Sequence, residues 1–543
     1  MKQKMILLSI VLLALATNAM GQQPNIVFIM ADDLGWTDIS SANTSLGNGS
    51  RYYESPNIDK LATEGKSFTY AYTQQNCQPT RAALISGQYA TGAHSGIYNV
   101  GSLNRLNKRN DPNPQISKIV PHQQNNYLQK ECVSMFETLK TVGYHTGFFG
   151  KLHAIKTGEH ASTYLGVDRN LALRKEIRAT VNGQKVNNEF FAQKDDTKGW
   201  IFSHEGLKPY AQPYDSAYIT EVLEPMKNGN DPWLLEGTPK HLTDALGDAV
   251  IDYIKERTQA DQPFFAYVPF HAVHVSILPR PDLEAKYKAK QSTDPRHDRA
   301  DYAAFVELLD QTVGRIVNAL DDPNGDGDAS DGIAENTLVV FYSDNGGFMG
   351  PTDNTPLRLR KGTYYEGGVR VPLIFRYPGV IAANSVNSDQ EIHAVDFYPT
   401  LAEMAGAKLP GAQEHAIDGQ SIAPVLKGEK EALDTKRELY WHFPGYMDVR
   451  NYPQSVIHHR TVDNQHYKLF YRYEEGSYEL YNLNKDIGEK HNLLDGKPNQ
   501  ATLDLARIMN NKLRNWLMQN NAPTGTWRAS GEDVAYPPLD MGK

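Results

Sequence analysis

Cysteine is scarce in this chain, which has 543 residues but only Cys77 and Cys132. Two cysteines exclude a disulfide framework and a zinc cluster built from cysteine, because both need more thiols. The chain also has no excess of basic residues, since 55 Lys and Arg against 64 Asp and Glu give a net charge of −9. General nucleic-acid binders need a basic face, so we expect no nucleic-acid partner. The remaining composition, 40% hydrophobic and 10% aromatic, excludes disorder and indicates a folded protein with a large core.

Long hydrophobic runs are missing beyond the N-terminus, so we expect no integral membrane segment. The N-terminus itself combines Lys2 and Lys4 with a short apolar run over residues 5–16 and the small residues Ala19 and Gly21. This pattern is typical of a signal peptide and is too short for a comfortable membrane anchor. We therefore predict that residues 1–21 are removed and that the mature protein is exported, to the periplasm or the medium.

The main part of the chain alternates between strand and helix patterns. Short apolar runs indicate buried strands at residues 25–30, 146–149, 263–269 and 337–342. Amphipathic patterns indicate intervening helices at residues 57–65, 135–142, 239–257 and 302–320. This alternation predicts an α/β fold, in which helices sandwich a mainly parallel sheet.

The pattern changes near residue 430. Shorter strand patterns at hairpin spacing fill residues 438–482, and an amphipathic helix follows at residues 500–519. We predict a catalytic domain over residues 22–430 and a smaller subdomain over residues 431–543. The subdomain would contain an antiparallel sheet, a terminal helix and a tail.

Polar side chains follow each of the four predicted strands, where ligands of open α/β sheets bind. Asp32 and Asp33 follow the first strand, and Asp344 and Asn345 follow the last. Each pair read alone could be a helix cap, but together they offer hard oxygen ligands and no soft ones. This donor set predicts a site for Ca²⁺ or Mg²⁺ at the edge of the sheet.

The other two strands deliver cationic and proton-transferring groups. Lys151 and His153 follow the second strand, and His271 and His274 follow the third. Positive charge beside an imidazole suits an anionic ester such as a sulfate or a phosphate.

Cys77 introduces a short helical segment in which Pro79 is placed like the first helical residue and Gly87 like the stop. The free N–H groups of such a helix attract anions, and Arg81 lies in its first turn. Two alternatives remain for Cys77 from these residues alone. It could form a disulfide with Cys132, or it could be a thiolate nucleophile, although no partner base is evident nearby in the sequence.

These residues resemble a family, the formylglycine-dependent type I sulfatases of the alkaline phosphatase superfamily, which are arylsulfatase-like. Cys77-x-Pro79-x-Arg81 is similar to the signature that directs oxidation of the cysteine to formylglycine. Further segments resemble the family's metal and active-site motifs in the family's order, at residues 31–36, 143–153, 270–274, 343–347, 357–362 and 366–372. The resemblance extends from about residue 24 to about residue 495.

The resemblance implies an alkaline-phosphatase-like fold and a maturation enzyme that converts Cys77 to formylglycine. It also implies a metal ion, Ca²⁺ in preference to Mg²⁺, bound by Asp32, Asp33, Cys77 in its modified form, Asp344 and Asn345.

The resemblance further implies a role for each catalytic residue. The hydrated aldehyde of residue 77 would attack the sulfur with one hydroxyl and release sulfate after its second hydroxyl loses a proton. Arg81 would hold this group, and Lys151 and Lys361 would neutralise sulfate oxygens. His153 would accept the proton, and His274 would protonate the leaving oxygen.

The function expected from this resemblance is hydrolysis of a sulfate ester on a sulfated carbohydrate. One alternative is a phosphonate or phosphodiester hydrolase of the same superfamily, and another is a non-catalytic sulfoglycan-binding homologue. We also expect His459 and Arg460 of the small subdomain to line the rim of the pocket.

Overall fold

The computed structural model describes residues 23–90, 117–122, 127–156, 160–173, 179–181, 184–186, 190–429, 437–446 and 453–542. The predicted signal peptide, the boundary at residue 430 and the C-terminal Lys543 lie outside these residues.

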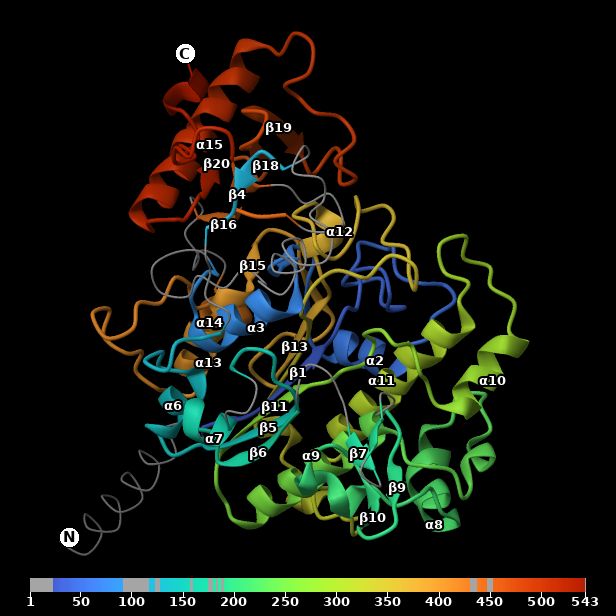
Figure 1. The fold of residues 1–543 in the computed structure, drawn as a ribbon. Coiled ribbons are helices and arrows are strands. Elements are labelled where there is room, and N and C mark those ends of the chain that lie inside the picture. The colour runs from blue at the N-terminus through green and yellow to red at the C-terminus, as the bar shows by residue number, and fades with distance from the viewer. Residues whose placement is uncertain are drawn as a thin grey trace, which may run out of the picture.

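An eight-stranded sheet forms the centre of the larger domain (Figure 1). Its strands, in spatial order, are β14 (Ser385–Asn387), β2 (Lys66–Phe68), β13 (Leu373–Arg376), β12 (Thr337–Ser343), β1 (Asn25–Ala31), β11 (Phe264–Pro269), β5 (His145–Lys151) and β6 (Arg169–Leu173).

The four strands predicted from apolar runs are neighbours at the middle of this sheet. β1 pairs in parallel with β11 on one side and with β12 on the other, and β11 pairs in parallel with β5. β13 is antiparallel to both β12 and β2, so the sheet is mixed but mainly parallel. The fold class expected from the sequence is confirmed.

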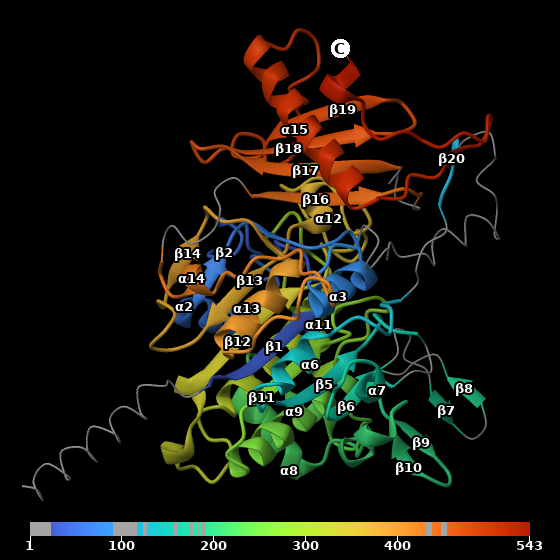
Figure 2. The ribbon, with the colours of Figure 1, turned by 90° about the vertical axis from the view of Figure 1, so that its left-hand side faces the viewer.

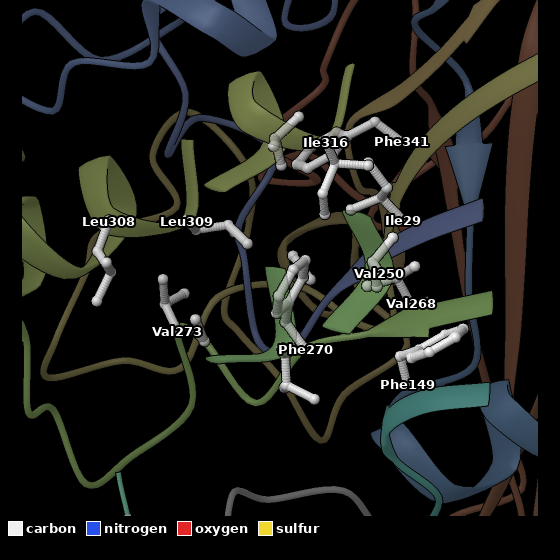
Figure 3. Packing of buried hydrophobic residues seen from close by; sticks show 14 of the residues in the cluster. Ile29, Phe149, Val250, Val268, Phe270, Val273, Leu308, Leu309, Ile316 and Phe341 are labelled. Atoms are coloured by element: carbon white, nitrogen blue, oxygen red, sulfur yellow. The ribbon is translucent and has the colours of Figure 1, made fainter. Parts of the chain in front are cut away.

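The two faces of the sheet are covered by different helices because side chains alternate along each strand. Val27 and Ile29 of β1 face one hydrophobic cluster, and Ile26 and Phe28 face the other. The first cluster includes residues of helices α2 (Pro56–Glu64), α9 (Leu242–Gln259), α10 (Pro281–Ala289) and α11 (Ala300–Asn318). Figure 3 shows part of this cluster. The second includes α3 (Cys77–Ser86), α6 (Met135–Lys140), α7 (Ala161–Tyr164), α13 (Phe397–Met404) and α14 (Ala423–Leu426).

The smaller C-terminal unit contains an antiparallel sheet and a long helix, as expected (Figure 2). Its strands are β16 (Glu438–Phe443), β17 (Gln454–Arg460), β18 (His466–Arg472) and β19 (Ser477–Asn482). One face of this sheet packs on α15 (Gln500–Gln519), and the other packs on the larger domain. Trp441 donates a hydrogen bond of 2.8 Å to the carbonyl of Thr73, just before the segment that carries Cys77.

Four short strand pairs complete the described architecture. They are β3 (Ala71–Tyr72) with β15 (Ile392–His393), β4 (Ile119–Val120) with β20 (Thr526–Trp527), β7 (Ala179–Val181) with β8 (Gln184–Val186), and β9 (Gln193–Asp195) with β10 (Gly199–Ile201). Because β4 pairs with β20, a segment from the first quarter of the chain contributes to the C-terminal unit. In the part of the chain described here, no helix is long and apolar enough to cross a membrane.

Two buried histidines are expected to make the fold sensitive to acid. Burial lowers the pKa of both His241 and His442 to about 4, from about 6.5 in an unfolded chain. The unfolded chain therefore binds protons that these two residues exclude in the folded chain, so the stability that they contribute is full above about pH 6.5 and is lost as the pH falls towards 4. At pH 5 each residue should cost roughly 2 kcal/mol of unfolding free energy.

Urea unfolding near pH 7.5 and near pH 5 measures this loss. Compared with the wild type, His442→Gln should raise the midpoint at pH 5 relative to the midpoint at pH 7.5, whereas His491→Gln, at a side chain that is 83% exposed, should leave that difference unchanged. A difference between the two midpoints that is the same in His442→Gln as in the wild type would contradict the expectation.

Candidate active site

The predicted site residues meet at the carboxyl edge of the central sheet. Asp32 and Asp33 follow β1, and Asp344 and Asn345 follow β12. Lys151 is the last residue of β5. Since β12, β1, β11 and β5 run in parallel and are adjacent, their ends deliver these side chains to one place.

Cys77 lies at the start of α3 and is 3% exposed. The helix begins at Cys77 itself, so the expectation that Pro79 is the first helical residue is wrong by two positions. Gly87 ends the helix as predicted, with a left-handed φ of 68° that favours glycine. The Cys77 Sγ lies 3.3 Å from Oδ1 of Asp32 and 3.7 Å from Oδ1 of Asp33. The start of helix α3 therefore points the side chain of residue 77 at Asp32 and Asp33, which form the acidic pair of the site.

The two alternative roles of Cys77 do not fit this geometry. Cys77 and Cys132 are both free thiols, so the disulfide between them is not formed. Burial and the charges of Asp32 and Asp344 raise the pKa of the Cys77 thiol far above its usual range. A thiol held in its protonated form is a poor nucleophile, which argues against a thiolate mechanism.

Arg81 is completely buried and joins three elements of the site. Its Nε and Nη2 donate to Oδ2 of Asp344 at 2.9 and 2.7 Å, and its Nη1 donates to the carbonyl of Lys151 at 2.9 Å. A buried, charge-assisted pair in which two N–H groups donate to one carboxylate oxygen fixes the guanidinium more strongly than a surface salt bridge does. Arg81 therefore locks the first turn of α3 to the ends of β12 and β5.

Two lysines bring positive charge to the acidic pair. The ammonium of Lys151, which is 1% exposed, donates to the carboxylate of Asp32. The ammonium of Lys361 donates to Oδ1 of Asp33 at 2.5 Å and to Sγ of Cys77 at 3.2 Å. Burial alone would raise the pKa of Asp32, but Lys151 and the other nearby cations hold it well below its usual range. The site thus combines ionised carboxylates with the ammonium groups of Lys151 and Lys361, which together form its cationic wall.

The acidic residues fit a divalent cation. One ligand atom from each of Asp32, Asp33, Cys77 and His274 lies within 4.8 Å of the others. The buried Oδ2 of Asp33 and Oδ1 of Asn345 have no hydrogen-bond partner among the described residues. Buried oxygen atoms without donors are suited to a hard cation, and carboxylate and amide oxygens are the ligands that Ca²⁺ and Mg²⁺ prefer.

Asp344 is placed differently from the two aspartates after β1. Its Oδ2 accepts both hydrogen bonds from Arg81, and its Oδ1 accepts one from the backbone N–H of Asp33 at 3.1 Å. It is therefore a support for the acidic pair as well as a candidate ligand.

Two histidines lie at the same edge of the sheet. Nε2 of His274 lies 3.8 Å from Oδ2 of Asp33, and 26% of the His274 side chain is exposed. His153 is half-buried and lies two residues beyond the end of β5, with a φ of 50°. The partial exposure of His274 places it where a substrate group entering from solvent could meet it.

The two residues expected at the rim of the pocket are held in ion pairs. Arg460 has only 5% of its side chain exposed, and its Nε lies 3.7 Å from Oε2 of Glu391. The prediction is wrong for Arg460, because a side chain that is almost completely buried beside Glu391 does not line a rim that faces solvent. His459 lies 3.2 Å from Glu438, and a rim position for it stays a prediction.

The segment that carries Lys361 has a buried support that could not be recognised from the sequence. Lys468 of β18 is completely buried, and its ammonium lies 2.8 Å from Glu366 and 3.3 Å from Glu489. Glu366 begins the short helix α12 (Glu366–Val369), five residues after Lys361. No sequence signal marks Lys468, because a lysine within a strand usually faces solvent.

Comparison with known proteins gives family and structural matches over most of the chain. The model of the Sulfatase family matches residues 24–407, and the model of the N-sulphoglucosamine sulphohydrolase C-terminal region matches residues 359–519. The structure of Ps i-CgsB in complex with k-i-k-neocarrahexaose is similar, with a TM-score of 0.65 and 26% identity over 93% of this chain and 95% of that one. Its likeness supports the alkaline-phosphatase-like fold.

Curated relatives give the same family. A protein named Sulfatase from Formosa agariphila is 72% identical over 522 residues, which cover 96% of this chain and 94% of that protein. Human arylsulfatase A (Homo sapiens) is 29% identical over 516 residues, which cover 89% of this chain and 86% of that enzyme. These matches, together with the acidic pair, the buried cysteine and the cationic wall at the edge of the sheet, show that the chain belongs to the sulfatase family and is a sulfuric ester hydrolase.

Proposed function

We propose that this sulfatase hydrolyses the sulfate ester of a sulfated carbohydrate, with formylglycine at position 77 as its nucleophile and Ca²⁺ as its metal. The observation that carries the proposal is the position of Cys77, whose Sγ lies 3.2 Å from the Lys361 ammonium and 3.3 Å from Asp32 at the start of a helix. A nucleophile placed there would meet an anionic group between cations and a metal site.

Formylglycine in its hydrated form would supply an oxygen nucleophile at position 77. Ca²⁺, when bound by Asp32, Asp33, Asp344 and Asn345 together with residue 77, would draw negative charge from the sulfate group.

The residues of the chain would orient the sulfate ester and move its protons. Lys151 and Lys361 would neutralise the sulfate oxygens that point at them. Arg81, fixed by Asp344, would hold the hydroxyl group of the modified residue 77. His153 would accept a proton from that residue, and His274 would donate one to the leaving oxygen of the alcohol.

The proposed role of His274 predicts a dependence on the leaving group. His274→Ala should lower kcat/KM on a sugar sulfate by about 100-fold, because a sugar alkoxide leaves poorly without a proton. The loss on 4-nitrophenyl sulfate should be much smaller, since nitrophenolate needs no proton to leave. Steady-state kinetics on the two substrates measure the ratio, and an equal loss on both would contradict the role of His274 as general acid.

The alternative activity is cleavage of a phosphonate or phosphate diester. Turnover of an aryl sulfate and of the matching aryl phosphodiester by the same preparation separates the two. Because the site belongs to a sulfatase, we expect the sulfate to be cleaved faster by kcat/KM. Faster cleavage of the phosphodiester would overturn the proposed reaction.

A carbohydrate substrate is supported by the solved structure of Ps i-CgsB, whose ligand is k-i-k-neocarrahexaose. Screening sulfated oligosaccharides for released sulfate tests this class of substrate.

We further propose that a formylglycine-generating enzyme matures the chain, that residues 1–21 direct export, and that the domains divide near residue 430.

A further inference from the structure

Three buried polar side chains meet where the small sheet packs on the larger domain. Glu391 directly precedes β15, His458 lies in β17 and His466 begins β18. Their exposed fractions are 4%, 1% and 0%. None of the three belongs to the candidate active site.

The three side chains are close enough to share one ligand. One ligand atom from each lies within 4.8 Å of the other two. Nδ1 of His466 lies 3.1 Å from Oε1 of Glu391. The two imidazole rings have centroids 5.3 Å apart, and the His466 ring stacks on Tyr70 at 3.9 Å. Two elements of the small sheet and one of the larger domain therefore supply the cluster.

The cluster contains an unusual number of buried polar atoms without partners. Both ring nitrogens of His458, both ring nitrogens of His466 and Oε1 of Glu391 form no hydrogen bond of acceptable geometry with any described residue. Buried polar side-chain atoms in folded proteins normally have a partner, and leaving one without costs free energy. Unpartnered donors and acceptors that gather at one point indicate a missing ligand there.

We propose that Glu391, His458 and His466 bind the divalent metal Zn²⁺. The bound ion would link the C-terminal sheet to the larger domain. Two imidazoles and one carboxylate are a known donor set for zinc, and the nitrogen ligands distinguish this site from the oxygen-rich candidate active site. The metal would give a partner to atoms of all three side chains at once. Its role is structural, so it does not depend on the reaction proposed above.

A simple ion pair between His466 and Glu391 explains less of the geometry. Such a pair would use one nitrogen of His466 but would leave both nitrogens of His458 without a partner. Glu391 also has a cation nearby, since Nε of Arg460 lies 3.7 Å from its Oε2.

The other buried cations near the cluster have carboxylates of their own. Lys468 pairs with Glu366 and Glu489, and Arg370 pairs with Glu366. These charges therefore do not exclude a divalent ion from the cluster.

Metal content of the full chain tests the proposal. The protein is produced with zinc in the medium, dialysed in excess Ca²⁺ so that oxygen-rich sites are occupied, and analysed by mass spectrometry for zinc. We expect about one zinc per wild-type chain, and its loss in His458→Gln and in His466→Gln. His459→Gln is the matched control, because adjacent residues of a strand face opposite sides, and it should keep the zinc. Absence of zinc from the wild type, or zinc retained by His458→Gln, would overturn the proposal.

X-ray absorption at the zinc edge gives a second test that needs no variant, in case the substitutions prevent folding. The wild-type spectrum should show a first shell of nitrogen and oxygen with the outer shells of imidazole. A sulfur neighbour would assign the zinc to Cys77, and a shell of oxygen alone would assign it to the acidic pair. Either result would overturn the proposed site.

Discussion

Replacement of Cys77 by alanine should abolish turnover, with kcat/KM on an aryl sulfate lower by about 10⁴-fold or more. Residue 77 lies at the centre of the candidate site, since polar atoms of Asp32, Asp33 and Lys361 all lie within 3.7 Å of its Sγ. Without the side chain that becomes the nucleophile, the remaining cations can bind the sulfate but cannot attack it. Initial rates at saturating and limiting substrate measure the loss.

The other cysteine provides the matched control for this substitution. Cys132 is a free, partly buried thiol that packs on the hydrophobic cluster at the side of α6 and α13, so Cys132→Ser should retain full activity. A Cys77→Ala protein that still turns over at more than about a hundredth of the wild-type rate would show that residue 77 is not the nucleophile.

Cys77→Ser gives a more specific outcome. Serine supplies one hydroxyl, which can accept the sulfuryl group, but lacks the second hydroxyl that would expel it. We expect at most one equivalent of alcohol to be released per chain, followed by arrest. Multiple turnovers by this variant would contradict the need for a second hydroxyl.

The second large effect is expected at Lys361. Among the described residues, the Lys361 ammonium is the only cation with a hydrogen bond to Sγ of Cys77, and it also donates to Asp33. Lys361→Met keeps the length of the side chain but removes the charge that would stabilise the developing negative charge on the sulfate. We expect kcat/KM to fall by about 10³-fold.

Two further measurements separate this effect from damage to the fold. Lys60→Met removes a lysine whose side chain is 58% exposed and should leave kcat/KM unchanged. Circular dichroism of Lys361→Met should match the wild type. A loss of less than about tenfold in a folded Lys361→Met protein would remove Lys361 from the proposed catalytic set.

Much of the fold could be predicted because the apolar runs are strong local signals. The predicted strand at 337–342 and the predicted helix at 500–519 agree with β12 and α15 to within one residue. β2 and β14 were missed because three-residue strands carry too little periodicity to be recognised. The pairing of β4 with β20 joins residues about 400 positions apart, which no local pattern can indicate.

The site shows the same division between local and long-range information. The acidic pair, Lys151 and Asn345 could be predicted because each lies at the end of a strand or just after it, and the apolar runs of the sequence show where these strands end. The buried ion pair of Arg81 with Asp344 could not be predicted, since two residues 263 positions apart must first be brought together by the sheet. The cluster of Glu391, His458 and His466 was missed for the same reason, because Glu391 adjoins β15 whereas the two histidines lie in β17 and β18.

Peptide mass spectrometry of residue 77 tests the central claim most directly. The protein is purified from its native host or from a host with a formylglycine-generating enzyme, and active fractions are digested and treated with an aldehyde-specific reagent. We predict that the peptide containing residue 77 carries an aldehyde and that the aldehyde content rises in proportion to specific activity. A fully active preparation in which Cys77 remains a thiol would contradict the account, and an inactive thiol form in the native host would instead favour a sulfoglycan-binding protein.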